Sequence, residues 1–179
     1  MANIKTKLSA AVLGLILAGA PASVILDQFL NEKEGNRMVA YLDSSGIWTI
    51  CRGVIRVDGQ AVVKGMRLSV EKCAEVNAIE ERKALAWVDS NIKVPLTEPQ
   101  KAGIASFCPY NIGPGKCFPS TFYKRLNAGD RKGACEAIRW WVHDKGRDCR
   151  LTKGQSSGCF GQVERRDQES TLACWGLDQ

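Results

Sequence analysis

A run of residues without charge stands out near the N-terminus. Residues 8–26 carry no charged side chain, Lys5 and Lys7 precede them, and Asp27 follows. A run of 19 residues has the length of a helix that spans a bilayer and exceeds the core of a usual signal peptide. Because positive charge stays on the cytoplasmic side, the two lysines would leave the N-terminus in the cytoplasm and send the remaining chain outward.

The uncharged run divides the chain into a signal-anchor segment, residues 1–26, and a globular domain, residues 27–179. One domain of about 150 residues is a common size and buries enough surface to fold without help. A cleaved signal peptide is the alternative, because Ala20-Pro21-Ala22 places small residues where a signal peptidase needs them before Ser23.

Downstream, the apolar positions change from a strand-like to a helical spacing. A short helix over residues 27–34 is expected to end at Gly35, and residues 36 to about 57 show β-type content around an Asp-Ser-Ser-Gly turn. A long helix is predicted from Ser69 to about Asn91, and the capping box Thr97-x-x-Gln100 predicts the start of the next helix. Three more helices are predicted, from Ser120 to Asn127, from Asp130 through Trp141 and from Gly161 to Trp175. Residues 144–160, rich in Gly, Ser, Lys and Arg, form a loop. This order of elements indicates an α+β fold that is mainly helical.

The net charge of +6 and the pI near 8.9 suggest an anionic partner. Nucleic acid is not expected, because the Lys and Arg residues are scattered and form neither a recognition motif nor a basic helix. A bacterial wall and outer surface are also anionic and would attract the protein equally well.

Eight cysteines in a domain that can fold without staples indicate an oxidising compartment. A zinc site is not favoured, since there is no C-x2-C pair and His143 is the only histidine. Eight cysteines allow 105 pairings. Short loops containing Gly favour Cys108–Cys117 and Cys149–Cys159, and the remaining four cysteines would then pair as Cys51–Cys73 and Cys135–Cys174.

The chemistry is concentrated in residues 34–49, EGNRMVAYLDSSGIWT. Asp43 follows Glu34 by nine residues, and Thr49 follows Asp43 by six. Two carboxyl groups with a strand turn between them suit cleavage of a glycosidic bond. One must hold a proton for the leaving oxygen, while the other stays ionised to direct a water or a nucleophile.

The pattern Glu-x8-Asp-x5-Thr, with Gly35, Tyr41 and Gly46 at their offsets, resembles the phage-type lysozymes (endolysins, glycoside hydrolase family 24). The segment from Phe107 to Thr121 is similar to the family's F-x-x-N-x-G-x-G…F-x-x-S-T pattern, and Arg165-Arg166-x-x-Glu169 to its last helix. The resemblance covers about residues 27–176. It implies a lysozyme-like fold, with a small β-hairpin lobe, a helical lobe and a saccharide cleft between them.

The resemblance implies a role for each residue of the first motif. Glu34 would be the general acid, and apolar neighbours at the junction of the lobes would keep it protonated near neutral pH. Asp43 would be the ionised carboxylate that orients a water, and the hydroxyl of Thr49 would help to hold that water, which favours inversion over retention. Simpler explanations exist for two of them: Asp before Ser-Ser-Gly is a favoured start of a turn, and Thr is an ordinary strand residue.

The resemblance also places Tyr110 and Asn111 among the substrate contacts of the cleft, although Asn-x-Gly-x-Gly could equally be a plain turn. The chain departs from the family where Gly-x-Gly-His often follows the Thr. Here the sequence reads Cys51-Arg52-Gly53-Val54, which puts the local packing of the hairpin in question.

These features predict an exported muramidase that cleaves the β-1,4 bond between N-acetylmuramic acid and N-acetylglucosamine and lyses a bacterium from inside. We expect peptidoglycan as substrate, no metal or cofactor, no nucleic acid and a monomer. The uncharged segment resembles the signal-arrest-release segments of some endolysins, so we expect the protein first in the host inner membrane, facing the periplasm, and then free in the periplasm. The alternatives are a lytic transglycosylase and a cationic wall-binding protein without catalysis.

Overall fold

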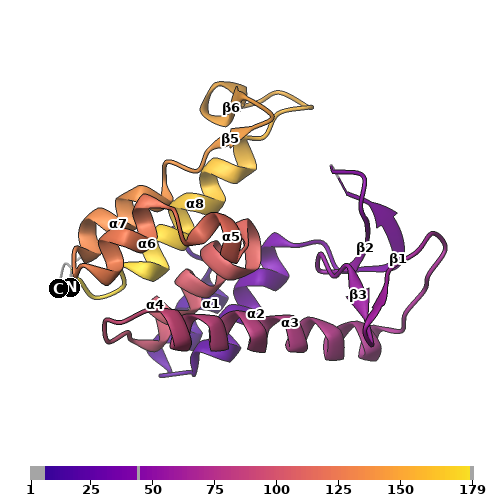
Figure 1. Ribbon diagram of the computed structural model, residues 1–179, viewed down its shortest axis with the longest axis horizontal. Helices are drawn as coiled ribbons and strands as arrows, with labels where there is room; N and C mark the ends of the chain where they lie inside the picture. The colour runs from indigo at the N-terminus through magenta and orange to yellow at the C-terminus, as the bar shows by residue number, and fades with distance from the viewer. Residues whose placement is uncertain (1–6, 44, 178–179) are drawn as a thin grey trace.

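The computed structural model describes residues 7–43 and 45–177. Lys5 of the predicted anchor and Ser44 of the predicted turn lie outside these residues. The chain forms a helical lobe and a small β-lobe, and the longest helix, α3 (Val70–Asn91), runs from one to the other (Figure 1).

The uncharged N-terminal segment is folded into two helices, α1 (Ala10–Leu17) and α2 (Ala22–Lys33). Ser9 caps α1, and the chain turns at Gly19, whose φ of 71° is in the left-handed region that glycine adopts without strain. None of the described helices is both long and apolar enough to cross a membrane.

Helix α2 begins at Ala22, five residues earlier than predicted, because Pro21 is tolerated at a helix start and Ile25 continues the buried face of the helix. The helix ends as expected before Gly35, but not by the expected mechanism. Glu34 is already extended, with φ −101° and ψ 128°, and Gly35 does not have the left-handed φ of a helix C-terminal glycine.

Residues of both N-terminal helices contribute to the main hydrophobic core. The side chains of Leu8, Val12, Ile25 and Leu26 are buried there, together with residues of α3 and of the helices that follow. The opposite face of α1 stays exposed, and Leu17 keeps 83% of its surface accessible.

The β-lobe consists of two hairpins. Strands β1 (Arg37–Leu42) and β2 (Trp48–Cys51) pair antiparallel, as do the short strands β3 (Arg56–Val57) and β4 (Gln60–Ala61). A second, smaller core lies between these strands and the first turns of α3, and it contains Ile50, Cys51, Val54, Val57, Val62, Cys73 and Val76. The site of interest lies where α2 passes into this lobe.

The predicted helices of the second half are present, with small shifts of their ends. They are α4 (Glu98–Ala105), α6 (Thr121–Asn127), α7 (Arg131–Ile138) and α8 (Phe160–Ala173). Ser69, Ser120 and Asp130 cap their helices as predicted. Two elements were not predicted, a π-helical turn, η1 (Ser106–Ile112), and the short α5 (Pro114–Cys117).

Helix α7 stops at Ile138, before the two tryptophans that were predicted to belong to it. Trp141 packs on the core, with its ring centroid 5.9 Å from that of Phe107, whereas Trp140 stays half exposed beneath Arg125. Ending the helix lets the two neighbouring indoles face different surroundings.

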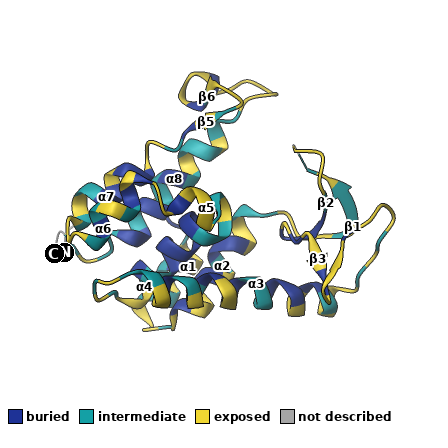
Figure 2. Cartoon of the chain, viewed as in Figure 1, coloured by how far each residue is buried: buried dark blue, intermediate teal, exposed yellow. Residues whose placement is uncertain are grey.

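The predicted loop before α8 is an arm with its own structure. It contains a hairpin of β5 (His143–Asp144) and β6 (Arg147–Asp148) and a 3-10 turn, η2 (Cys149–Thr152), and it projects away from the helices (Figure 1). Most of the arm is exposed, in contrast to the inward faces of the helices at its base (Figure 2).

All eight cysteines are paired, as Cys51–Cys73, Cys108–Cys117, Cys135–Cys174 and Cys149–Cys159. These are the four pairs expected from the sequence. The first connects β2 to α3 within the small core, and the last holds the arm to the start of α8.

Candidate active site

Glu34 stands at the junction of the two lobes, in the first residue after α2. Its backbone N–H still donates to the carbonyl of Leu30, so its position is fixed by the helix. Its Oε1 lies 2.6 Å from Nη1 of Arg165, and a quarter of the side chain is exposed. This side of the carboxyl group therefore faces a guanidinium rather than the apolar neighbours expected from the sequence.

Arg165 is held on α8 by a carboxylate of its own. Nε of Arg165 lies 3.0 Å from Oε1 of Glu169, a fully buried residue that also pairs with Arg166 and accepts a hydrogen bond of 2.7 Å from Ser106 Oγ. The spacing i, i+4 on one helix face brings Arg165 and Glu169 together. Glu34 is thus oriented by an ion-pair network that is mostly shielded from water.

Helix α8 is also pressed close against α4, which fixes the position of this network. A Cβ at Gly103 of α4 would lie 2.6 Å from the backbone N of Ala173 and 2.9 Å from the carbonyl of Glu169. Only glycine permits this approach.

Asp43 opens the turn between β1 and β2. Its Oδ1 accepts hydrogen bonds from the backbone N–H of Ser45, at 2.8 Å, and of Ile47, at 2.9 Å. The turn role considered in the sequence analysis is therefore present. It occupies one carboxylate oxygen, and among the described residues no hydrogen bond reaches Oδ2 of Asp43 or Oε2 of Glu34.

Tyr41 connects these residues. It is the register partner of Thr49 across the β1–β2 ladder, so both side chains project from the same face of the hairpin. Burial raises the pKa of the Tyr41 phenol; Arg37, stacked 4.4 Å from its ring, opposes this, while the negative charges of Glu34 and Asp43 add to it. Both carboxylates therefore lie within electrostatic reach of one phenol.

Thr49 is buried, and its hydroxyl donates to the carbonyl of Ile47 at 3.0 Å. Its oxygen can still accept a hydrogen bond. A water held by Thr49 would therefore have to be the donor.

A family model for phage lysozymes matches residues 31–169 of the chain. The chain belongs to the phage lysozyme family. It is 78% identical over 179 residues to a protein of Escherichia phage N15 named SAR-endolysin, with both chains covered completely. It is 74% identical over 177 residues, 99% of this chain and 98% of the other, to a protein of Escherichia coli K12 named probable prophage lysozyme.

A solved structure supports the same assignment. The endolysin from Escherichia coli O157:H7 phage FAHEc1 is 34% identical and superimposes with a TM-score of 0.69, over 87% of this chain and 92% of that chain. The predicted mainly helical lysozyme-like fold is confirmed. As a family member, the protein is a glycoside hydrolase.

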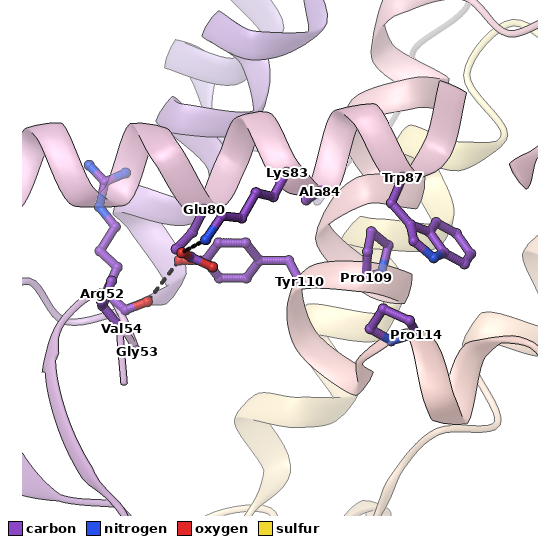
Figure 3. Close-up of a pocket in the computed structure, with 10 residues that line it drawn as sticks. All are labelled: Arg52, Gly53, Val54, Glu80, Lys83, Ala84, Trp87, Pro109, Tyr110 and Pro114. Atoms are coloured by element: carbon purple, nitrogen blue, oxygen red, sulfur yellow. Dashed lines mark hydrogen bonds and ion pairs between the residues drawn. The ribbon is translucent and has the colours of Figure 1, made fainter. Parts of the chain in front are cut away.

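The two proposed substrate contacts of this lysozyme lie on η1. Asn111 is exposed, and its Oδ1 accepts from Arg166, which ties it to α8. Tyr110 points toward Arg52 and donates its hydroxyl to the carbonyl of that residue at 2.7 Å (Figure 3). Burial raises the pKa of Tyr110 strongly, with the charges of Glu34 and Glu81 adding to the effect.

Tyr110 also lines a pocket of about 350 Å³ between the β-lobe and α3. Figure 3 shows the apolar wall of this pocket, formed by Trp87, Pro109 and Pro114, opposite the backbone of Arg52 and Gly53. Glu80 and Lys83 of α3 add charge at its rim.

The departure Cys51-Arg52-Gly53-Val54 forms a buried charged junction. Cys51 has a φ of 54°, left-handed although it is not glycine, and its disulfide holds it there. Nη1 of Arg52 lies 2.7 Å from Asp27 and 2.9 Å from Glu81, so this residue joins α2 to α3. Sequence reasoning noticed the departure but missed that function, because the three partners are far apart in the chain.

Arg165 was also missed as a site residue, although its motif was noticed. The available signal was the Arg-Arg-x-x-Glu spacing, which places two cations and one anion on a single helix face. That spacing does not indicate that Glu34 is the fourth residue of the ion-pair network. Among the described residues, no three side chains of the metal-ligating types come together.

The Arg52 junction predicts a pH-dependent stability. Burial raises the pKa of Glu81 to about 7; the charge of Asp27 adds to this, and Arg52 opposes it. Because the folded pKa lies above the unfolded one, this contribution is full below about pH 4.5 and is lost as the pH rises through about 7. Glutamine cannot titrate, so the Glu81→Gln variant does not lose this contribution. Its free energy of unfolding, relative to that of the wild type, should therefore rise by about 2 kcal/mol from pH 5 to pH 8.

Urea unfolding of the wild type and of Glu81→Gln at the two pH values measures this difference. The other titrating groups are the same in both proteins, so their contributions cancel. Glu80→Gln, on the neighbouring and more exposed carboxyl group, is the control. A parallel dependence in Glu81→Gln and the wild type would show that Glu81 does not titrate in this range.

Proposed function

We propose that this phage lysozyme is an endolysin that hydrolyses the β-1,4 bond between N-acetylmuramic acid and N-acetylglucosamine in peptidoglycan and thereby lyses the host cell for phage release. The observation that carries the proposal is a pair of carboxyl groups, Glu34 at the end of α2 and Asp43 in the β1–β2 turn. Glu34 and Asp43 are each fixed through one oxygen, and each has a second oxygen to offer to a substrate.

In this mechanism Glu34 is the general acid. Arg165 holds Oε1, so the proton on Oε2 faces the glycosidic oxygen as it leaves. Asp43 uses Oδ2 to accept a proton from the attacking water, and Thr49 accepts a second hydrogen bond from that water. A water on the opposite side of the sugar from the acid gives inversion.

Product analysis separates hydrolysis from the transglycosylase alternative. Purified protein is incubated with peptidoglycan, and the released fragments are weighed by mass spectrometry. Hydrolysis gives muramic acid ends that are one water heavier than the anhydro ends of a transglycosylase. Anhydro ends as the main product would overturn the proposal, and wall binding without loss of turbidity would select the non-catalytic alternative.

The proposal includes a membrane-bound stage. We infer that residues 8–26 first insert as a signal anchor in the host inner membrane, that the enzyme faces the periplasm, and that collapse of the membrane potential releases it. Nine of these residues are Leu, Ile or Val, worth about −3 to −5 kcal/mol together on the insertion scale, which two Gly, two Ser and Pro21 reduce. The packed helices α1 and α2 then represent the released form, in which the core covers one face of the segment.

Two glycines test this release in separable ways. A side chain at Gly14 would meet nothing within 4 Å in the packed form, so Gly14→Leu strengthens insertion without harming the released enzyme. Gly19 has a left-handed φ, so Gly19→Leu also strains the packed form. We expect Gly14→Leu to shift protein to the membrane fraction and the double variant to hold it there, inactive.

Fractionation of cells before and after depolarisation, followed by blotting, gives the measurement. Gly115→Leu, at an open position on α5 outside the segment, is the matched control. A mature protein that begins at Ser23 would identify a cleaved signal peptide instead and end the release model.

A further inference from the structure

A second pocket lies beside the proposed acid, on the side of α8. It measures about 330 Å³ and is lined by Lys33, Asn111, Gly161, Gln162, Arg165 and Arg166. The lining comes from the end of α2, from η1 and from the first turns of α8, so the pocket exists only in the folded chain. We call it the Lys33 pocket.

The Lys33 pocket carries an excess of positive charge. Three cations line it, and two of them share the buried carboxylate of Glu169, while Arg165 also pairs with Glu34. Three positive charges against two negative ones leave one in excess.

Lys33 supplies the charge that the network does not neutralise. No carboxylate of a described residue lies within ion-pair distance of its Nζ, which lies over the ring of Phe29, 5.4 Å from the centroid. The two arginines, in contrast, are locked in place by Glu169. A flexible ammonium beside two fixed guanidinium groups suits a compact anion that enters from solvent.

One neutral hydrogen-bond donor, the amide of Asn111, completes the lining. The Oδ1 of Asn111 accepts from Arg166, so the amide NH2 of Asn111 is left to donate. Gln162 is anchored by its own NH2, which donates to the carbonyl of Trp141 at 3.0 Å. The pocket therefore offers donors and positive charge, the features that a carboxylate requires.

We propose that the Lys33 pocket binds a carboxylate carried by the muramic acid unit of the substrate, and that Lys33 determines the preference for peptidoglycan over neutral polymers of N-acetylglucosamine. This inference rests on the proposed function for its substrate. N-acetylmuramic acid differs from N-acetylglucosamine by a lactyl group, which ends in a carboxylate or extends into the stem peptide with its own carboxylates. Because Arg165 lines the pocket and also pairs with Glu34, the bound carboxylate lies close to the bond that is cleaved.

The test compares Lys33→Met, which keeps an unbranched apolar stem and removes the charge, with Lys33→Arg, which restores the charge. Lys93→Met is the matched control, because it makes the same change in net charge at an exposed lysine outside the pocket. On soluble peptidoglycan we expect Lys33→Met to raise KM about 10-fold, the effect of one charge-assisted hydrogen bond, with kcat changed by less than about 2-fold. Lys33→Arg should recover most of the KM.

Binding of small ligands shows which carboxylate of the substrate the pocket holds, and this measurement does not depend on catalysis. Titrations followed by NMR use N-acetylmuramic acid, a muramyl tripeptide and N-acetylglucosamine. Lys33→Met should weaken binding of the tripeptide, of N-acetylmuramic acid, or of both, which assigns the stem peptide or the lactyl group as the source. N-acetylglucosamine should bind both proteins equally.

Two results would overturn the pocket assignment: equal KM and affinity in Lys33→Met and Lys93→Met, or an equal loss for N-acetylglucosamine. The failure of the proposed function is a different result. In that case wild-type protein would release no hydrolysis product from peptidoglycan, while the charge-dependent binding of the muramyl ligands would still report on the pocket.

Discussion

Glu34→Gln should lower the rate of peptidoglycan clearance by at least about 10²-fold, the low end for loss of a general acid. Gln keeps the shape of the side chain and an oxygen that accepts from Arg165, so the ion-pair partner stays hydrogen-bonded. What disappears is the proton that can be transferred to the leaving oxygen. The fall should therefore be in kcat, with the melting temperature close to that of the wild type.

The control for this variant is Glu32→Gln, on the carboxyl group two residues earlier, which bonds to Ser9 and Gln28 on the surface. It should clear turbidity at nearly the normal rate. A Glu34→Gln enzyme that clears peptidoglycan as fast as Glu32→Gln would end the assignment of Glu34.

Asp43→Asn separates the catalytic role from the turn role. Asn retains an Oδ1 that accepts from the N–H of Ser45 and of Ile47, so the turn is preserved. If Asp43 only starts the turn, activity stays normal. We expect a loss comparable to that of Glu34→Gln, and a smaller one for Thr49→Ala.

Reduction of the disulfides should produce the largest loss of stability, about 2–4 kcal/mol for each bridge. In the chain-entropy model the loss grows with the loop that a bridge closes: about 4 kcal/mol for Cys135–Cys174, which spans 39 residues, and about 2.5 kcal/mol for Cys108–Cys117, which spans nine. Since a domain of this size has about 5–15 kcal/mol in total, loss of all four bridges should unfold it.

Alkylation without reductant, followed by intact-mass measurement, tests the pairing in exported protein. No thiol should be modified, because every cysteine is bonded. Paired Cys→Ser variants then rank the bridges by urea unfolding. Several readily alkylated thiols in active protein would contradict an oxidised fold.

Much of the candidate site could be proposed from the sequence because its residues lie close together in the chain. The nine-residue and six-residue offsets from Glu34 to Asp43 and to Thr49 lie within one helix end and one hairpin. Because one helix end and one hairpin contain all three residues, their offsets could be recognised without knowledge of the tertiary structure. The caps at Ser69 and Asp130 were also local, since a cap bonds within three residues.

The ends of elements were less predictable where packing decides them. Helix α2 starts at Ala22 because Ile25 joins the core, and α7 stops at Ile138 because its two tryptophans need different surroundings. Neither reason is present in the pattern of the segment itself, because each depends on what the rest of the chain brings into contact.

By itself the sequence indicated the family and the favoured disulfides, and it supplied the candidate pair of carboxyl residues and an uncharged segment long enough for a membrane. Only the tertiary structure decided that this segment is broken at Gly19 and packed into the core. Only the tertiary structure also brought Arg165 to Glu34, 131 positions away, and Arg52 to Asp27 and Glu81. The physical reason is that a buried charged group pairs with the opposite charge that the folded chain brings beside it. The separation of two residues along the chain does not show which residues these will be.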